Sequence, residues 1–130
     1  PVSCAVALKT LEIYERDKVF QHAKKVGEYF QNSIKEILKE DYVGEVRGIG
    51  LIAGIELYKD PLNKIAFEEA GKAGKILSDT CQKNGLIVRP ILDTIALCPP
   101  LIISEKEIDE LTDKLKKSLQ EAKDEIMKIH

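Results

Sequence analysis

The 130-residue sequence has no tryptophan, a single methionine and no excess of charge of either sign. Its 20 basic and 22 acidic residues are interspersed and leave a formal net charge of -2. Domains that bind nucleic acid or anionic lipid concentrate positive charge on one surface, and this sequence has no such concentration. It therefore predicts neither nucleic acid nor a membrane as a partner.

Long hydrophobic runs and paired cysteines are also missing. The longest apolar run, residues 95–103, contains two prolines and is too short to span a bilayer. Nothing in it is typical of a secretory signal. The three cysteines, Cys4, Cys81 and Cys98, are odd in number, widely spaced and set among apolar residues. This pattern favours reduced, structural thiols in a cytoplasmic protein over disulfides or a zinc site.

What the sequence does contain is an alternation of helical and extended segments. With 44% hydrophobic and 32% charged residues, it predicts one domain, residues 1–130, with a core of its own. Four segments have the apolar period of amphipathic helices: residues 2–15, 19–39, 67–84 and 104–126. β-Branched residues and glycines over residues 43–57 predict two strands, or one long bent strand with a break near Gly48–Gly50.

A second pair of strands is predicted close to the C-terminus. Residues 86–91 and 94–98 form a hairpin across Leu92 and Asp93, and Pro99 and Pro100 end the pairing because proline cannot donate a ladder hydrogen bond. The predicted fold class is α+β, a small, mainly antiparallel or mixed sheet covered by helices.

Three local signals mark helix ends. Asp17 is a suitable N-cap for the second helix, and Gly85 after Asn84 is the usual left-handed stop for the third. Ser104 and Glu107 have the spacing of a capping box at the start of the last helix.

Most candidate chemistry has an ordinary structural explanation. Gly48, Gly50 and Gly54 do not form a phosphate loop, because extended chain and not a helix follows them. His22 and His130 have no partner at metal-ligand spacing and are interpreted as surface residues. The serines lie in helices or at a cap, without a nucleophile elbow. The sequence predicts no catalytic residue and no metal ligand in this chain.

Arg89 is the exception, because it interrupts an apolar segment where an unpaired guanidinium is costly to bury. Pro90 restricts Arg89 to extended geometry, which suits a bidentate grip on a carboxylate or phosphate. The residues alone leave two interpretations open. Arg89 either binds an external anion or lies on an exposed strand face, paired with a carboxylate of its own chain, which is the commoner role.

Three motifs in this order resemble the C-terminal small domain of the class III aminotransferases, and most closely the ω-amino acid:pyruvate aminotransferase and ω-transaminase subgroup. The motifs are PVSCAVALKTLEIYERD, VGEVRGIGLIAGIEL and GLIVRPILDTIALCPPLIISEKEIDEL. These enzymes have fold type I and depend on pyridoxal phosphate. The similarity extends over essentially the whole chain, and it implies that the sequence is a fragment that begins within a helix.

The resemblance implies specific roles for three sites. Arg89 matches the arginine that binds the carboxylate of the amino-acid or keto-acid substrate and that swings away for an amine without a carboxylate. Arg47 matches a recurring arginine with a structural or interface role. The segment Cys98–Pro100 matches a small-residue-Pro-Pro pattern that shapes the wall near the substrate.

The resemblance also implies what lies elsewhere. The Schiff-base lysine, the aspartate at the pyridine nitrogen and the phosphate-binding loops belong to a large domain and a second subunit of a homodimer. The isolated chain is therefore expected to bind no cofactor and to be inactive. Two alternatives stay open, a free-standing module that binds a small carboxylate without catalysis and a structural domain that docks on a partner.

Overall fold

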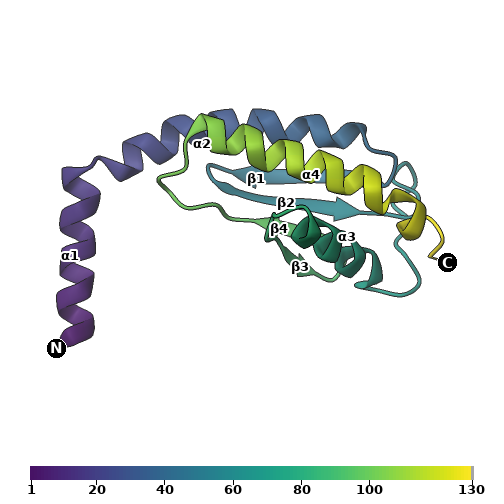
Figure 1. Ribbon diagram of the computed structural model, residues 1–130, viewed down its shortest axis with the longest axis horizontal. Coiled ribbons are helices and arrows are strands. Elements are labelled where there is room, and N and C mark those ends of the chain that lie inside the picture. The colour runs from purple at the N-terminus through teal and green to yellow at the C-terminus, as the bar shows by residue number, and fades with distance from the viewer. Residues whose placement is uncertain (130) are drawn as a thin grey trace.

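The computed structural model describes residues 1–129 and contains four α-helices, one 3₁₀ turn and four strands (Figure 1). The helices are α1 (Val2–Arg16), α2 (Val19–Lys35), α3 (Lys72–Lys83) and α4 (Glu105–Ile126), and η1 (Glu36–Lys39) follows α2 directly. The strands are β1 (Val43–Ile49), β2 (Ile52–Leu57), β3 (Arg89–Ile91) and β4 (Thr94–Leu97).

The four strands form one antiparallel sheet in the order β1-β2-β4-β3. β1 and β2 are two strands joined by a tight turn, in which Gly50 has a positive φ of 55°. β4 ends at Leu97, directly before Cys98 and the two prolines. These findings confirm the predicted α+β class and the antiparallel pairing. They also show that residues 43–57 form two strands and not one long bent strand.

Helices cover one face of the sheet and leave the other face open. Buried and less buried residues alternate along β2 and β4, as expected when one face of an antiparallel sheet packs on the core. The core lies between the inner face of the sheet and helices α2, α3 and α4. Its largest fully buried side chains are Tyr42, Phe30, Ile34, Ile37, Ile55, Leu57, Leu77, Ile95, Ile108, Leu115, Leu119 and Ile126.

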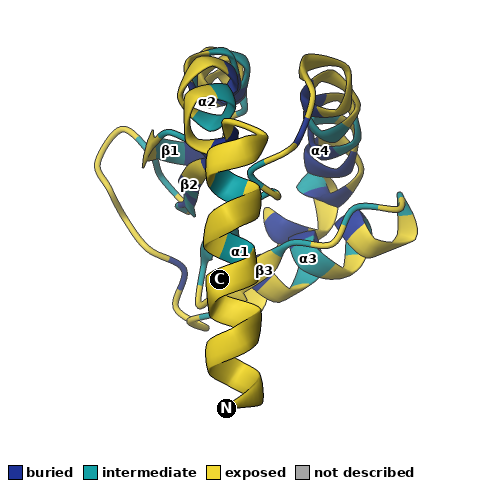
Figure 2. Cartoon of the chain, turned by 90° about the vertical axis from the view of Figure 1, so that its left-hand side faces the viewer, coloured by how far each residue is buried: buried dark blue, intermediate teal, exposed yellow. Residues whose placement is uncertain are grey.

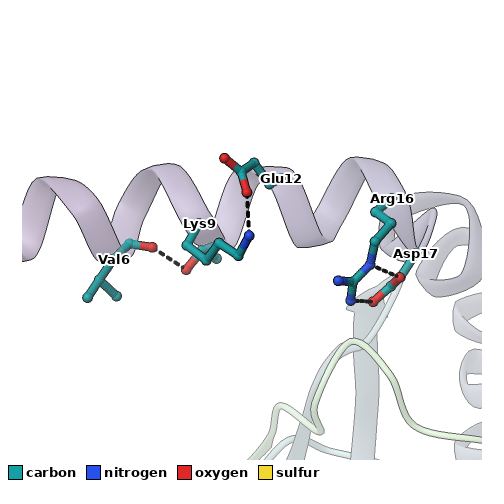
Figure 3. Close-up of polar contacts among 6 residues, drawn as sticks. Val6, Lys9, Glu12, Arg16 and Asp17 are labelled. Atoms are coloured by element: carbon teal, nitrogen blue, oxygen red, sulfur yellow. Dashed lines mark hydrogen bonds and ion pairs between the residues drawn. The ribbon is translucent and has the colours of Figure 1, made fainter.

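The start of α2 differs from the prediction. Asp17 is not its N-cap, because Lys18 occupies that position with a left-handed φ of 51°. The Asp17 carboxylate is instead held by Arg16, whose Nε and Nη2 donate to it over 2.7 and 2.8 Å (Figure 3). Asp17 ends α1 and makes the corner between the two helices.

The start of α3 also lies later than the apolar period predicted. Phe67 is buried but precedes the helix, which begins after Gly71. Gly71 has a positive φ of 85°, which a helix cannot contain. At the other end, Gly85 has the predicted left-handed conformation with a φ of 76°. The predicted capping box is confirmed at Ser104, which begins α4.

Helix α1 extends away from the rest of the molecule and contributes no buried residue (Figures 1 and 2). Its apolar side chains, including Val6, Leu8 and Leu11, are largely exposed. Polar contacts on its surface, such as Lys9 with Glu12, stay within the helix (Figure 3). The predicted apolar face therefore exists, but the described chain does not cover it. Among residues 1–129, no helix combines the length and the apolar character needed to cross a membrane.

Candidate substrate-carboxylate site

Arg89 is the first residue of β3, at the edge of the sheet. It lies opposite Ala96 of β4, on the face that the helices leave open. Its side chain is exposed, so the guanidinium avoids the burial penalty that its apolar neighbours suggested.

Local sequence fixes the direction of the chain on both sides of Arg89. The left-handed Gly85 turns the chain out of α3, and the Leu86 amide donates to the Cys81 carbonyl over 2.9 Å. After Pro90, the chain reverses at Leu92, which has a φ of 52°. The predicted hairpin is confirmed, but its first strand is only three residues long because residues 86–88 do not pair with β4.

Two arginines lie at opposite ends of one row across the open face. The register pairs Arg47 with Gly54, Gly54 with Ala96, and Ala96 with Arg89. The two central residues are small, so little side-chain bulk separates the arginines. A Cβ atom added to Gly54 would be 4.0 Å from Cγ of Arg47, an ordinary contact between residues that face each other on paired strands.

The surroundings of the two arginines are different. Nη1 of Arg47 donates to Glu56 over 2.5 Å and lies 3.4 Å from Glu45. The hydrogen bond to Glu56 raises the pKa of Arg47. Within residues 1–129, no salt bridge involves Arg89. The intrachain carboxylate partner that the residues alone suggested is therefore not observed, and Arg47 has that structural role instead.

A groove of about 540 Å³ adjoins Arg89. Apart from Arg89 and the Cys98 thiol, its lining side chains are hydrocarbon. The lining consists of Ile52, Leu86, Ile87, Val88, Arg89, Ile91, Ala96, Leu97, Cys98, Pro99, Pro100, Ile103 and Leu111. One guanidinium beside an apolar wall suits a small molecule with a carboxylate and a hydrocarbon body.

The residues Cys98, Pro99 and Pro100 all line this groove, where the resemblance had suggested a wall. Cys98 is exposed, and so is Cys4 in α1, whereas Cys81 is buried. Burial gives Cys81 the expected structural role in the core, whereas the exposed Cys4 and Cys98 have no packing role within the described chain. All three are unpaired, as predicted.

The other sequence candidates have structural roles in the described chain. His22 is half-buried and not on the surface, because its Nε2 lies 2.8 Å from the Ile103 carbonyl and fastens α2 to the segment before α4. His130 lies outside the described residues. Gly50 lies in the β1–β2 turn, and Gly54 lies within β2, where it pairs with Ala96 of β4. The glycines are therefore followed by extended chain, as predicted.

Sequence reasoning missed Asp93, which it treated only as part of a hairpin turn. Its carboxylate accepts hydrogen bonds from the amides of Gly71 and Gly74, over 2.8 and 3.0 Å. Gly71 has no side chain to cap α3, but nothing in the sequence shows that Asp93 lies next to the start of this helix.

The chain offers no enclosed site for a metal or a Schiff base among residues 1–129. No cluster of three or more histidine, cysteine, aspartate or glutamate side chains could hold a metal ion there. Every lysine of that part is exposed or half-exposed, whereas a Schiff-base lysine requires a pocket that lowers its pKa. These residues therefore do not fit pyridoxal phosphate by themselves.

Comparison with known proteins gives a consistent result. The family model described as Aminotransferase class-III matches residues 1–119. The chain is 34% identical over 129 residues to a probable gamma-aminobutyrate transaminase 3, mitochondrial, from Oryza sativa subsp. indica, covering 99% of this chain and 25% of the relative. It is 38% identical over 119 residues to the adenosylmethionine-8-amino-7-oxononanoate aminotransferase of Methanocaldococcus jannaschii, covering 92% and 26%.

Solved structures agree with these relatives. The structure of a transaminase with L-ala has a TM-score of 0.93 at 38% identity, over 98% of this chain and 30% of that one. A thermostable omega transaminase mutant from Pseudomonas jessenii also has a TM-score of 0.93, at 32% identity, over 98% and 28%. The chain thus spans about a quarter of the length of the curated relatives it matches.

Proposed function

The chain belongs to the class III aminotransferase family, and we propose that it binds the substrate carboxylate of a transaminase through Arg89. The observation that carries the proposal is the difference between Arg89 and Arg47. Arg47 is neutralised by Glu56, whereas Arg89 has no salt-bridge partner among residues 1–129 and adjoins an apolar groove.

Arg89 is chemically suited to this task. A guanidinium is always charged, and its planar donors match the two oxygens of a carboxylate. Its long, exposed side chain can also turn to solvent when the other substrate is an amine without a carboxylate. One side chain would then serve both substrates of an amino-group exchange.

The proposed substrates follow from the family and from the activities for which the relatives are named. Amino donors would be ω-amino acids or amines, and the acceptor would be a keto acid such as pyruvate. The keto acid presents a carboxylate to Arg89 and its short carbon chain to the groove.

The cofactor of this family is pyridoxal phosphate, which would supply an electron sink for negative charge on the carbon next to the transferred amino group. Because residues 1–129 enclose no lysine, we place the Schiff-base lysine and the phosphate contacts outside this chain. The chain alone would then be inactive and free of cofactor.

We further propose that residues 1–130 are the C-terminal small domain of the complete enzyme, next to a large domain and a second subunit. The exposed apolar side chains of α1 support a surface that is covered in the assembly. The unpaired thiols support a reducing compartment such as the cytoplasm.

The test is the Arg89→Ala variant of the full-length protein that carries this sequence. Losing a charge-assisted hydrogen-bonded pair weakens binding of the transition state by about 1.5–3 kcal/mol. For pyruvate, kcat/KM should therefore fall roughly 10- to 100-fold. The value for an amine donor without a carboxylate should change by less than about twofold.

Arg47→Ala is the matched control, because it removes the same charge from the same row of the open face. Any change that it causes in kcat/KM should be similar for pyruvate and for the amine donor. Equal losses for pyruvate and the amine in Arg89→Ala would contradict the proposed role.

A further inference from the structure

The turn that follows Arg89 is attached to the N-terminus of α3. The first amides of a helix have no partner within the helix, and Gly71 at the N-cap has no side chain to supply one. Asp93 supplies it from the hairpin, with Oδ2 accepting from the Gly71 amide and Oδ1 from the Gly74 amide. A residue about twenty positions away in sequence thus acts as the cap of this helix.

The segment that contains Arg89 is therefore attached to both ends of α3. At the C-terminal end, the Leu86 amide donates to the Cys81 carbonyl over 2.9 Å. At the N-terminal end, the Asp93 carboxylate binds the helix amides. Residues 86–93 run alongside the helix between these two attachments, and Arg89 lies near their midpoint.

The contact at the turn is close and involves backbone atoms. A Cβ atom added to Gly74 would lie only 2.0 Å from the Leu92 carbonyl oxygen, so the turn packs directly on the helix. The Asp93 carbonyl also accepts a hydrogen bond from the Leu57 amide of β2 over 2.9 Å. The turn is thus fixed to both the helix and the sheet.

Strand β3 has little other support. It pairs with β4 at three positions, and Pro90 at the middle one has no amide to donate. The position of Arg89 therefore depends on how its two flanks are held, and the hydrogen bonds of the Asp93 side chain hold one of them.

We propose that Asp93 is a positioning residue that holds Arg89 in register with the substrate carboxylate by fastening the β3–β4 turn to α3. The proposal rests on the proposed function of Arg89. A guanidinium must match both oxygens of a carboxylate, so a displacement of the hairpin weakens this contact before it affects the fold.

The experiment compares Asp93→Ala and Asp93→Asn in the full-length protein. Because misplacement by about 1 Å can reduce activity by as much as 100-fold, we expect Asp93→Ala to raise KM for pyruvate by about tenfold. KM for an amine without a carboxylate should stay within about twofold. Asp93→Asn keeps one acceptor oxygen and should give an intermediate value.

Ser104→Ala is the matched control for Asp93→Ala. It also removes a helix cap, at the start of α4, but it does not touch the β3–β4 turn. It should lower stability without distinguishing the substrates. Hydrogen exchange adds a readout that is independent of turnover, since the Gly71 and Gly74 amides should exchange faster in Asp93→Ala and not in Ser104→Ala.

Gly74→Ala tests the same contact from the helix side and leaves Asp93 in place. Its methyl group should displace the Leu92 carbonyl and reproduce the selective rise in KM for pyruvate. Gly27→Ala is its control, because a Cβ there would lie 2.8 Å from Cα of Gly50 in the other hairpin turn. Gly27→Ala should affect both substrates alike.

The Arg89→Ala result separates the two proposals. If Arg89→Ala is selective but Asp93→Ala and Gly74→Ala impair both substrates as their controls do, Asp93 is a stability residue only and the positioning role is overturned. If Arg89→Ala itself is not selective, the proposed function fails and the positioning role fails with it. Selective losses in all three variants support both.

Discussion

Arg89 and Arg47 show how the same residue type takes different roles on one face of a sheet. Both are exposed, and both belong to the row that crosses β1, β2, β4 and β3. Glu45 and Glu56 lie next to Arg47, on its own strand and on the facing strand, whereas Ala96 faces Arg89. An exposed salt bridge contributes little to stability. The main effect of Glu56 is therefore to make Arg47 unavailable to an external anion.

Tyr42 allows a prediction at the scale of one residue. Its ring is fully buried, and its hydroxyl donates to the Leu119 carbonyl of α4 over 2.6 Å. Burial raises the pKa of this hydroxyl, so it stays protonated and keeps the bond. Tyr42→Phe should lower the free energy of unfolding by about 1 kcal/mol, measured by urea denaturation.

Tyr29→Phe is the control for that measurement. The Tyr29 hydroxyl also donates over 2.6 Å, but to the exposed carboxylate of Asp109. Its loss should change stability less than the loss of the buried bond, because water replaces an exposed partner. An equal or larger effect at Tyr29 would contradict the importance given to burial.

At the scale of elements, α3 connects the core to the proposed site. Its inner face buries Ala73, Leu77 and Cys81, and both of its ends hold the segment that contains Arg89. The hairpin therefore takes its position from a helix that is itself fixed by the core. This explains how a three-residue edge strand can present a side chain in a defined place.

The capping box of α4 allows a prediction about pH. The Ser104 hydroxyl, and then the Ser104 amide, donate to Glu107 and hold its pKa below the ordinary value of 4.5. The stabilisation is thus present above pH 4.5 and is lost as the pH falls through the lowered pKa of the folded state. Glu107→Ala should be less stable than the unmodified protein near neutral pH.

The measurement is urea denaturation of both proteins from about pH 7 down to about pH 3, and the difference between them should shrink below pH 4.5. Glu110→Ala is the control, since the Glu110 carboxylate pairs with Lys114 on the surface of the same helix and does not contact the helix end. Its effect on stability near neutral pH should be smaller than that of Glu107→Ala. A constant difference across the range would show that Glu107 stabilises α4 without its charge.

At the scale of the whole molecule, α1 is separate from the cooperative core. It has no buried residue, and Figure 2 shows it as an almost entirely exposed helix in front of the packed elements. In the isolated 130-residue chain, we expect its amides to exchange with solvent much faster than those of β2 and α4. Slow exchange throughout α1 would show that another surface, such as a second copy, covers it.

The isolated chain should also bind keto acids poorly. Its groove is open, and one exposed ion pair contributes only about 0–1 kcal/mol. Calorimetry with pyruvate should therefore show no saturable binding at millimolar concentration. Clear saturable binding would favour the alternative of a free-standing carboxylate-binding module.

The sequence by itself determined the elements whose signals are local. Apolar periods placed all four helices, the capping box at Ser104 and the stop at Gly85 were recognised from a few neighbouring residues, and Pro99 marked the end of the last strand. Arg89 could be singled out because one charge in an apolar segment is visible without a structure. The motif order also sufficed to recognise the family.

Only the tertiary structure decided which side chains meet. Asp93 reaches amides about twenty residues away, and His22 contacts a carbonyl 81 residues along the chain, so no local pattern predicts either contact. The same holds for the pairing of Arg47 with Glu56, which leaves Arg89 as the arginine of the row without a salt bridge among residues 1–129. The physical reason is that period and capping depend on the nearest residues, whereas exposure and pairing depend on the register of strands and the packing of helices.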